Sequence, residues 1–270
     1  NAKENQDHVM MKSIWLSSVA GLASLLAGTT ASALDGTFDR SVEVNAYVAM
    51  AKEGTRGDLI VKSKEIYVSG ISDPRLAQAL SERLLNDYQT LRQSNRADTQ
   101  YGSWLVKALA SQGLDEYAAT LKQVKAGVKS GQVKMECGDE LDLIAWHQRK
   151  NDIMSSRQYY VEGENPRASQ LLNLLMSDDF ALKHMAADRI SWEKIKSPRL
   201  YDAMEKQLLT YMDSTGVASG RQQDKSMGMY AKLLGYSNDK KYRLVLEAVI
   251  ASEAGTLLKS HAKDALARLQ

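Results

Sequence analysis

Apolar residues recur through most of the chain at the three- and four-residue spacing of an amphipathic helix. The spacing begins after Pro74 and returns after Pro198. It places the apolar side chains on one face of each predicted helix, where they can be buried together. The two stripes are Leu76, Ala79, Leu80 and Leu84, and Leu200, Ala203, Met204 and Leu208. Because the sequence has three prolines and few alternating β-branched residues, the pattern predicts an all-α fold, helical from about residue 57 onward.

The ends of the predicted helices carry matching signals. Asp73 and Ser197 stand where an N-cap side chain can accept a hydrogen bond from an unpaired amide, and each precedes a proline at the first helical position. Gly113 and Asn238, residue types that tolerate a left-handed backbone, stand where two further helices are expected to end. The sequence therefore predicts that these helices start and stop at equivalent positions.

The chain repeats itself at a spacing of 124 to 125 residues. Residues 71–85 return as 195–209, with the Pro-Arg-Leu turn identical, and residues 104–124 are echoed by 229–249. Recurring helical units are typical of stacked helices that present a continuous surface. Such a surface is more typical of a binding protein than of an enzyme. We expect an internal duplication of about 125 residues.

A shorter pattern, Leu-Lys-x-x-Ala-x-Asp-x-apolar, links further segments. It fits residues 182–190 and 258–266, and residues 133–141 follow the same frame. Cys137 occupies the position that an alanine holds in the other two copies. We interpret Cys137 as a small buried residue where helices approach one another, rather than as a reactive thiol.

These features resemble the HEAT-like family of α-solenoids, whose units are antiparallel helix pairs joined by a short turn, often Asp-Pro. The matching places are Ser72-Asp73-Pro74-Arg75, the alanine frames, and Ser177-Asp178-Asp179 before a predicted helix. The resemblance covers about residues 57 to 268. It implies an α-α superhelix in which a block of about three helix pairs was duplicated whole. The segment between the blocks departs from the pattern.

The beginning of the chain predicts export. Lys12 precedes an apolar run from Ile14 to Ala27, and a small-residue cleavage site completes a signal peptide over residues 11–33. The run is shorter than the roughly 18 to 20 residues that span a bilayer. We therefore expect a periplasmic or secreted product that begins at Leu34 and keeps no transmembrane anchor.

Five segments follow from these patterns. They are a leader at residues 1–33, an N-terminal segment at 34–56, a first helical repeat block at 57–142, a spacer at 143–166 and a second helical repeat block at 167–270.

The charge of the chain argues against one class of partner. The formal net charge is +2, and it stays so without the leader, where two lysines balance one aspartate and one glutamate. A nucleic-acid-binding protein would need a basic stripe to offset phosphate charge. A single cysteine cannot form an intramolecular disulfide, so stability in an oxidising compartment must come from the core. We expect no nucleic-acid partner.

Residues able to carry chemistry are sparse. His184 and His261 lie one residue apart in the repeat frame, and we interpret both as helix-surface residues rather than ligands. The densest acidic cluster lacks the spacing of a calcium loop and is interpreted as a solvated helix end. Its members are Glu136, Asp139, Glu140 and Asp142. We find no motif of a hydrolase nucleophile, a zinc protease or a phosphate-binding loop. The sequence predicts no catalytic residue, no cofactor and no metal.

Five residues are candidates for partner contacts. Trp146, Tyr159 and Tyr160 lie in the spacer and do not recur, so a specific contact could use them, although packing of the spacer could need them too. Arg75 and Arg199 recur one residue after a helix-starting proline, where the helix dipole disfavours a cation. Each arginine either bridges to a carboxylate or carbonyl of an adjacent helix, with Glu65 and Asp188 as the nearest repeated carboxylates, or receives an acidic partner.

The function predicted from these patterns is that of an exported, non-catalytic protein-binding scaffold or adaptor. A first alternative is an enzyme or enzyme accessory domain of the cell envelope, which a deep pocket gathering His147 with acidic side chains would favour. A second is a binder of envelope glycan or lipid, which a groove lined by carboxylates and aromatic rings would favour.

Overall fold

The computed structural model describes residues 38–214 and 220–269. All described residues belong to one compact unit. The predicted signal peptide at 11–33 and the expected mature start at Leu34 lie outside the described residues. Within them the fold is all-α, with twelve α-helices and no β-strand, as the hydrophobic pattern predicts.

Six helices make up the part before residue 156. They are α2 (Ser41–Glu53), α3 (Arg56–Ser69), α4 (Pro74–Asp87), α5 (Arg96–Ala110), α6 (Ala118–Gly127) and α7 (Gly131–Ser155). Helix α2 lies in the predicted N-terminal segment, so the helical part begins earlier than residue 57. Val44, Tyr47 and Ala51 form its buried stripe, and this short apolar face is what the helix packs against its neighbours.

Six more helices follow. They are α8 (Pro166–Leu175), α9 (Phe180–Trp192), α10 (Pro198–Ser214), α11 (Arg221–Tyr236), α12 (Arg243–Ala251) and α13 (Thr256–Arg268). Short 3-10 turns at Asp115–Tyr117 and Lys240–Tyr242 lead into α6 and α12, and a third, Tyr88–Thr90, follows α4.

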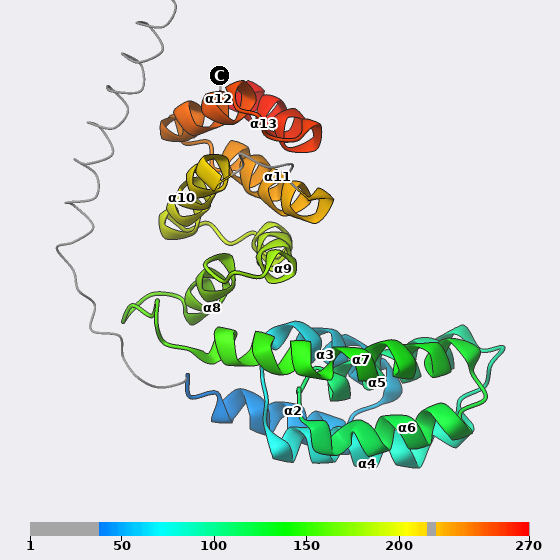
Figure 1. The fold of residues 1–270 in the computed structure, drawn as a ribbon. Coiled ribbons are helices and arrows are strands. Elements are labelled where there is room, and N and C mark those ends of the chain that lie inside the picture. Colours follow the sequence, from blue (N-terminus) through cyan, green and yellow to red (C-terminus); the bar gives the residue numbers. More distant parts are fainter. Residues whose placement is uncertain (1–37, 215–219, 270) are drawn as a thin grey trace, which may run out of the picture. The chain divides into compact units, whose positions relative to one another are not determined.

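Helices that are near in the sequence pack together. Each helix packs against its neighbour in the chain or the next helix but one, so that α2, α4 and α6 touch in order, as do α3, α5 and α7. Helices α8, α10 and α12 make the corresponding contacts, and so do α9, α11 and α13. Figure 1 shows the successive helix pairs from α8 to α13. Packing of this sequential kind keeps most tertiary contacts local in the chain.

The helix boundaries follow from local chemistry. Asp73 Oδ1 accepts a hydrogen bond of 2.9 Å from the backbone N–H of Arg75, and Pro74 opens α4, as expected. At the start of α10 the carbonyl of Ser197 accepts from the N–H of Tyr201 at 3.3 Å. Gly113 and Asn238 have φ of 67° and 58°, which confirms the predicted left-handed turns after α5 and α11.

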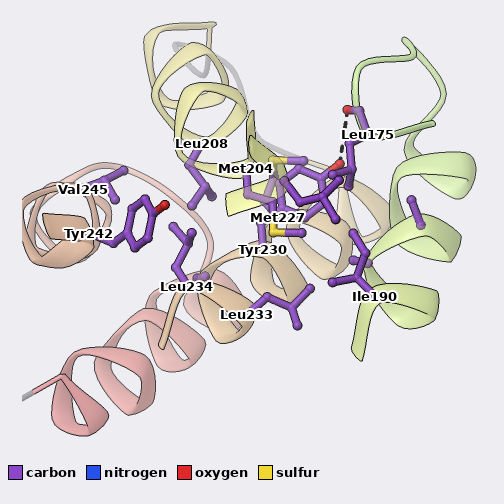
Figure 2. Close-up of a cluster of buried hydrophobic side chains, with 14 of the residues drawn as sticks. Leu175, Ile190, Met204, Leu208, Met227, Tyr230, Leu233, Leu234, Tyr242 and Val245 are labelled. Carbon is purple, nitrogen blue, oxygen red and sulfur yellow. Dashed lines mark hydrogen bonds between the residues drawn. The ribbon is translucent and has the colours of Figure 1, made fainter. Parts of the chain in front are cut away.

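The buried apolar side chains form two clusters. The first lies between Val44 and Ile144, and the second between Met154 and Leu269. Leu84 in the first and Leu208 in the second are buried, as their equivalent stripes predict. Figure 2 shows the second cluster, where the hydroxyl of Tyr230 donates to the carbonyl of Leu175 at 3.3 Å. That bond satisfies the hydroxyl of Tyr230, whose ring fills the core.

Helix α7 contributes to both clusters. It runs unbroken for 25 residues, and the position at which the first block was expected to give way to a spacer, residues 142 and 143, lies inside it. Ile144 belongs to the first cluster and Met154 to the second. The non-helical stretch between α7 and α8 is therefore shorter than the predicted spacer. Among the described residues no helix combines the length and the apolar character that crossing a bilayer requires.

Candidate functional site

Three buried ionisable side chains lie together on α7. Glu140, His147 and Lys150 are seven and three residues apart, which places them on one face of the helix. Nε2 of His147 lies 2.9 Å from Oε2 of Glu140, and Nζ of Lys150 lies 3.3 Å from Nδ1 of His147. The imidazole can donate to the carboxylate and accept from the lysine. The three groups therefore form one hydrogen-bonded relay.

The relay is closed by α3. Nζ of Lys150 donates to the backbone carbonyl of Tyr67 at 2.8 Å. The ring of Tyr67 stands edge-on to that of His147, with centroids 5.3 Å apart, and lies 5.4 Å from the ammonium of Lys150. Burial, reinforced by the charge of Glu140, raises the pKa of the Tyr67 hydroxyl. The network therefore fastens the middle of α7 to the end of α3.

Burial controls the protonation of this network. It lowers the pKa of Lys150 to about 7, against an opposing pull from Glu140. It also lowers the pKa of His147, although the hydrogen bond to Glu140 works in the other direction. His147 has no exposed surface and Lys150 is 1% exposed, so neither can meet a substrate in this conformation. We interpret the relay as a structural latch that is sensitive to pH.

Sequence reasoning missed this cluster for an identifiable reason. Glu140 was expected to belong to a solvated acidic helix end, which is wrong, because Glu140 lies in the middle of α7 and is buried. The spacing of Glu140, His147 and Lys150 along one helix face could have revealed the cluster. The segment boundary expected at residue 142 placed Glu140 in a different segment from the other two. Glu136 pairs instead with Lys107 of α5 at 2.8 Å. No group of three potential metal ligands occurs in residues 38–214 and 220–269.

The structure places the predicted aromatic contacts on α7 and in the loop after it. Trp146 is half-buried, and its ring centroid is 5.2 Å from that of His147. Tyr160 is also half-buried, between Phe38 at 5.5 Å and the guanidinium of Arg157 at 4.5 Å. Tyr159 packs against the second cluster. All three rings therefore have packing roles, and their use by a partner stays a prediction.

The two recurring arginines have different surroundings. Arg75 is exposed, pairs with Asp73 in its own turn at 2.9 Å and donates to Asn45 of α2 at 3.2 Å. Arg199 pairs with Glu164 and donates to the carbonyl of Tyr159 at 2.9 Å, both in the loop before α8. Each arginine thus touches the preceding part of the fold, but neither uses the carboxylate first expected for it.

Those expected carboxylates have other partners. Glu65 pairs with Lys62 of its own helix at 2.8 Å, and Asp188 lies 3.5 Å from Nε2 of His184. Cys137 is completely buried, and burial raises the pKa of its thiol to about 12. A thiol that is protonated and enclosed agrees with the small-residue role proposed for it.

An exposed tryptophan marks a surface groove. Trp192, at the end of α9, keeps 77% of its surface exposed and borders a groove of about 360 Å³. We call this the Trp192 groove. It is lined by residues of α2, α3, α8 and α9 with the positions between them, namely Arg40, Glu43, Tyr47, Lys64, Glu65, Val68, Ser69, Arg167, Arg189, Trp192 and Glu193.

Ion pairs hold the rim of the Trp192 groove. Arg167 pairs with Glu193 at 2.7 Å and donates to the carbonyl of Val68 at 3.3 Å, which joins α8 to α3. Arg40 pairs with Glu43 at 2.7 Å. Sequence reasoning did not single out Trp192, because a tryptophan within a helical pattern is expected to be buried.

The chain has no detected relative in three comparisons: no protein-family model, no curated protein and no solved structure matches it.

Proposed function

We propose that the chain is a HEAT-like α-solenoid built by duplication of a block of about 125 residues. Support comes from the helix starts, which recur at intervals of 124 or 125 residues. The pairs of first residues are Ser41 and Pro166, Arg56 and Phe180, Pro74 and Pro198, Arg96 and Arg221, Ala118 and Arg243, and Gly131 and Thr256. The spacing from one helix start to the next thus differs by at most one residue between the two halves.

Buried positions recur with the same interval. Leu105 and Leu109 of α5 correspond to Tyr230 and Leu234 of α11, and all four are buried. In α7 and α13 the buried positions Val133, Cys137 and Glu140 correspond to Leu258, Ala262 and Ala265. The helix contacts recur as well, since α5 packs on α3 and α7 as α11 packs on α9 and α13. A common ancestral block explains this agreement.

We propose further that this solenoid is an exported, non-catalytic scaffold that binds a protein partner at the Trp192 groove. The observation that carries the proposal is the exposure of Trp192. Exposing a large apolar ring to water forgoes the stabilisation that burial would give it, and tryptophan is among the residues that contribute most when an interface forms. A bound partner would supply the burial that the fold does not.

The composition of the groove supports a protein more than another ligand. Arg and Trp are enriched at protein interfaces, and the groove combines the exposed Trp192 with Arg189. Its carboxylates are engaged, because Glu43 and Glu193 pair with arginines of the same rim. Ion pairs of this sort make a polar edge around an apolar centre, which is the usual anatomy of an interface.

The proposal is tested by affinity capture with two matched variants. Trp192→Ala removes the exposed ring, and Leu244→Ala removes a side chain of α12 that is 68% exposed and lies outside the groove. Mature chains carrying each change are immobilised, exposed to an envelope extract, and compared with the parent by quantitative mass spectrometry. Both variants should keep the parent's unfolding midpoint, because each ring or side chain is mainly in water.

We expect a protein that the parent and Leu244→Ala capture equally, and that Trp192→Ala captures at least tenfold less, the scale on which truncation of a hot-spot residue acts. Equal capture by all three chains would contradict the groove as the binding site.

A glycan of the envelope is a second candidate, favoured by the carboxylates and aromatic rings that line the same groove. Cosedimentation of the parent and Trp192→Ala with purified peptidoglycan separates the two. Sedimentation of the parent that depends on Trp192 would favour the glycan. The enzyme alternative gains no support, because His147 and Glu140 meet where no surface is exposed.

A further inference from the structure

A second hollow lies across the first turns of α11 and α13 and the second turn of α9, at residues that the proposed groove does not include. Its volume is about 580 Å³. Its lining side chains are basic or uncharged, namely His184, Arg221, Gln222, Lys225, Met229, Leu257 and His261. No carboxylate is among them. We call this hollow the basic pocket.

The two permanent cations of the basic pocket have no partner within the described residues. Arg221 and Lys225 are exposed and make no ion pair or hydrogen bond there, whereas most arginines of the described part do, among them Arg167 and Arg199. Both stand in the first turns of α11, where the helix dipole already carries positive charge. Two unpaired cations at such a position give the pocket a strong preference for an anion.

The two histidines of the basic pocket differ in what surrounds them. The ring of His261 lies on Gly228 of α11, where a Cβ would come within 2.6 Å of Cδ2, so a side chain at that position would displace the ring. Burial lowers the pKa of His184 and the charge of Lys225 acts in the same direction, against an opposing pull from Asp188. His184 is therefore neutral near pH 7. A neutral imidazole can still donate a hydrogen bond.

The remaining lining is apolar. Leu257 is 41% exposed, and Met229 is half-buried beside it in the same pocket. A flexible methionine adapts to differently shaped apolar groups. An inorganic phosphate would use the cations but would leave these two side chains in water. A peptide that carries a carboxylate next to an apolar side chain satisfies both.

We propose that the basic pocket binds an acidic peptide segment, with a carboxylate against Arg221 and Lys225 and a neighbouring apolar side chain against Met229 and Leu257. The inference shares with the proposed function only that the partner is a protein. It does not depend on the Trp192 groove, so the two can fail separately.

The test measures binding of a fluorescein-labelled peptide of twelve alternating glutamate and leucine residues by fluorescence anisotropy. The comparison peptide has glutamine in place of glutamate. Proteins are the mature parent chain, Arg221→Gln/Lys225→Gln, and the control Lys122→Gln/Lys129→Gln, which removes two exposed lysines on and after α6. Trp192→Ala is included to show that the groove is not the site measured.

We expect the parent to bind the glutamate peptide with a dissociation constant below about 1 mM and at least tenfold more tightly than the glutamine peptide. The pocket variant should lose that tenfold preference, while the control and Trp192→Ala keep it. No binding by the parent, equal loss in pocket and control variants, or equal affinity for both peptides would overturn the proposal. Displacement of the peptide by phosphate at constant ionic strength, with equal potency at matched concentration, would overturn it as well.

Discussion

Removing the amino group of the buried relay should be strongly destabilising. Lys150→Met keeps the length of the side chain but deletes the amino group that faces His147 and the carbonyl of Tyr67. Nδ1 of His147 and that carbonyl then stay buried without their donor. A buried acceptor left without a partner costs about 1 to 3 kcal/mol, so two of them should cost roughly 2 to 5 kcal/mol at a pH at which Lys150 is uncharged.

A double substitution tests whether the three groups act as one network. Glu140→Gln removes the negative charge while leaving a group that can accept the hydrogen bond of His147. If the penalty of Lys150→Met arises from the broken network, Glu140→Gln should cost less in the Lys150→Met background than in the parent. Residues in one hydrogen-bonded network show coupling of about 0.5 to 3 kcal/mol, and we expect a value toward the upper end of that range.

The assay is equilibrium urea unfolding at pH 9.5, where Lys150, with a pKa of about 7 in the folded chain, is uncharged. The free energies of the parent, the two single variants and the double variant form the cycle. A cost of less than about 1 kcal/mol for Lys150→Met, the level of an exposed ion pair, would refute the description of a buried latch. Simple additivity of the two single variants would refute the coupling.

Lys150 also makes the free energy of unfolding depend on pH, in a direction that its lowered pKa determines. Its pKa is lowered from 10.5 to about 7 by folding, so between these values the unfolded chain binds more protons than the folded chain. The free energy of unfolding should therefore rise with pH from 7 toward 10, by up to about 1.4 kcal/mol per pH unit. Lys150→Met should lack this increment, and a parallel pH profile for parent and variant would contradict the assignment.

Three further predictions can be checked independently. Leu84→Ala and Leu208→Ala should each lower the free energy of unfolding by about 2 to 5 kcal/mol, because both side chains are buried at equivalent positions. Unchanged melting temperatures for both would contradict the repeat frame. Arg199→Leu should reduce thermal stability more than Arg75→Leu, because Arg199 joins a separate loop whereas Arg75 pairs mainly within its own turn. Loss of partner capture by the double arginine variant at unchanged stability would instead assign both residues to binding. N-terminal sequencing of exported material should begin at Leu34, and a product that retains the leader would refute the signal peptide.

Local signals made the helix boundaries predictable. The cap at Asp73 and Pro74 and the left-handed turns at Gly113 and Asn238 depend only on residues close by in the chain. Tertiary packing therefore did not override these signals. The buried stripes of α4 and α10 were predictable for the same reason, because period alone places Leu84 or Leu208 on the inner face.

The candidate sites could not be predicted in this way. Lys150 is buried because it meets a carbonyl 83 residues earlier in the chain, and such a partner leaves no trace in the local pattern. Trp192 is exposed because α9 ends there beside a rim of ion pairs, a result of how four helices meet. The basic pocket collects His184, Arg221 and His261 from three helices, although each residue alone is typical of a solvated helix surface.

The continuity of α7 has a mechanical consequence. In an array in which each unit touches only its neighbours, one half can melt while the other persists. Here a single helix, about 37 Å long at 1.5 Å per residue, supplies Val133 and Ile144 to one hydrophobic cluster and Met154 to the other. Fraying it from either end removes side chains from the cluster at that end and weakens the anchorage of the rest. Local opening at α8 should thus be felt at α5, and the described part of the chain should unfold as one cooperative unit rather than as two independent foldons.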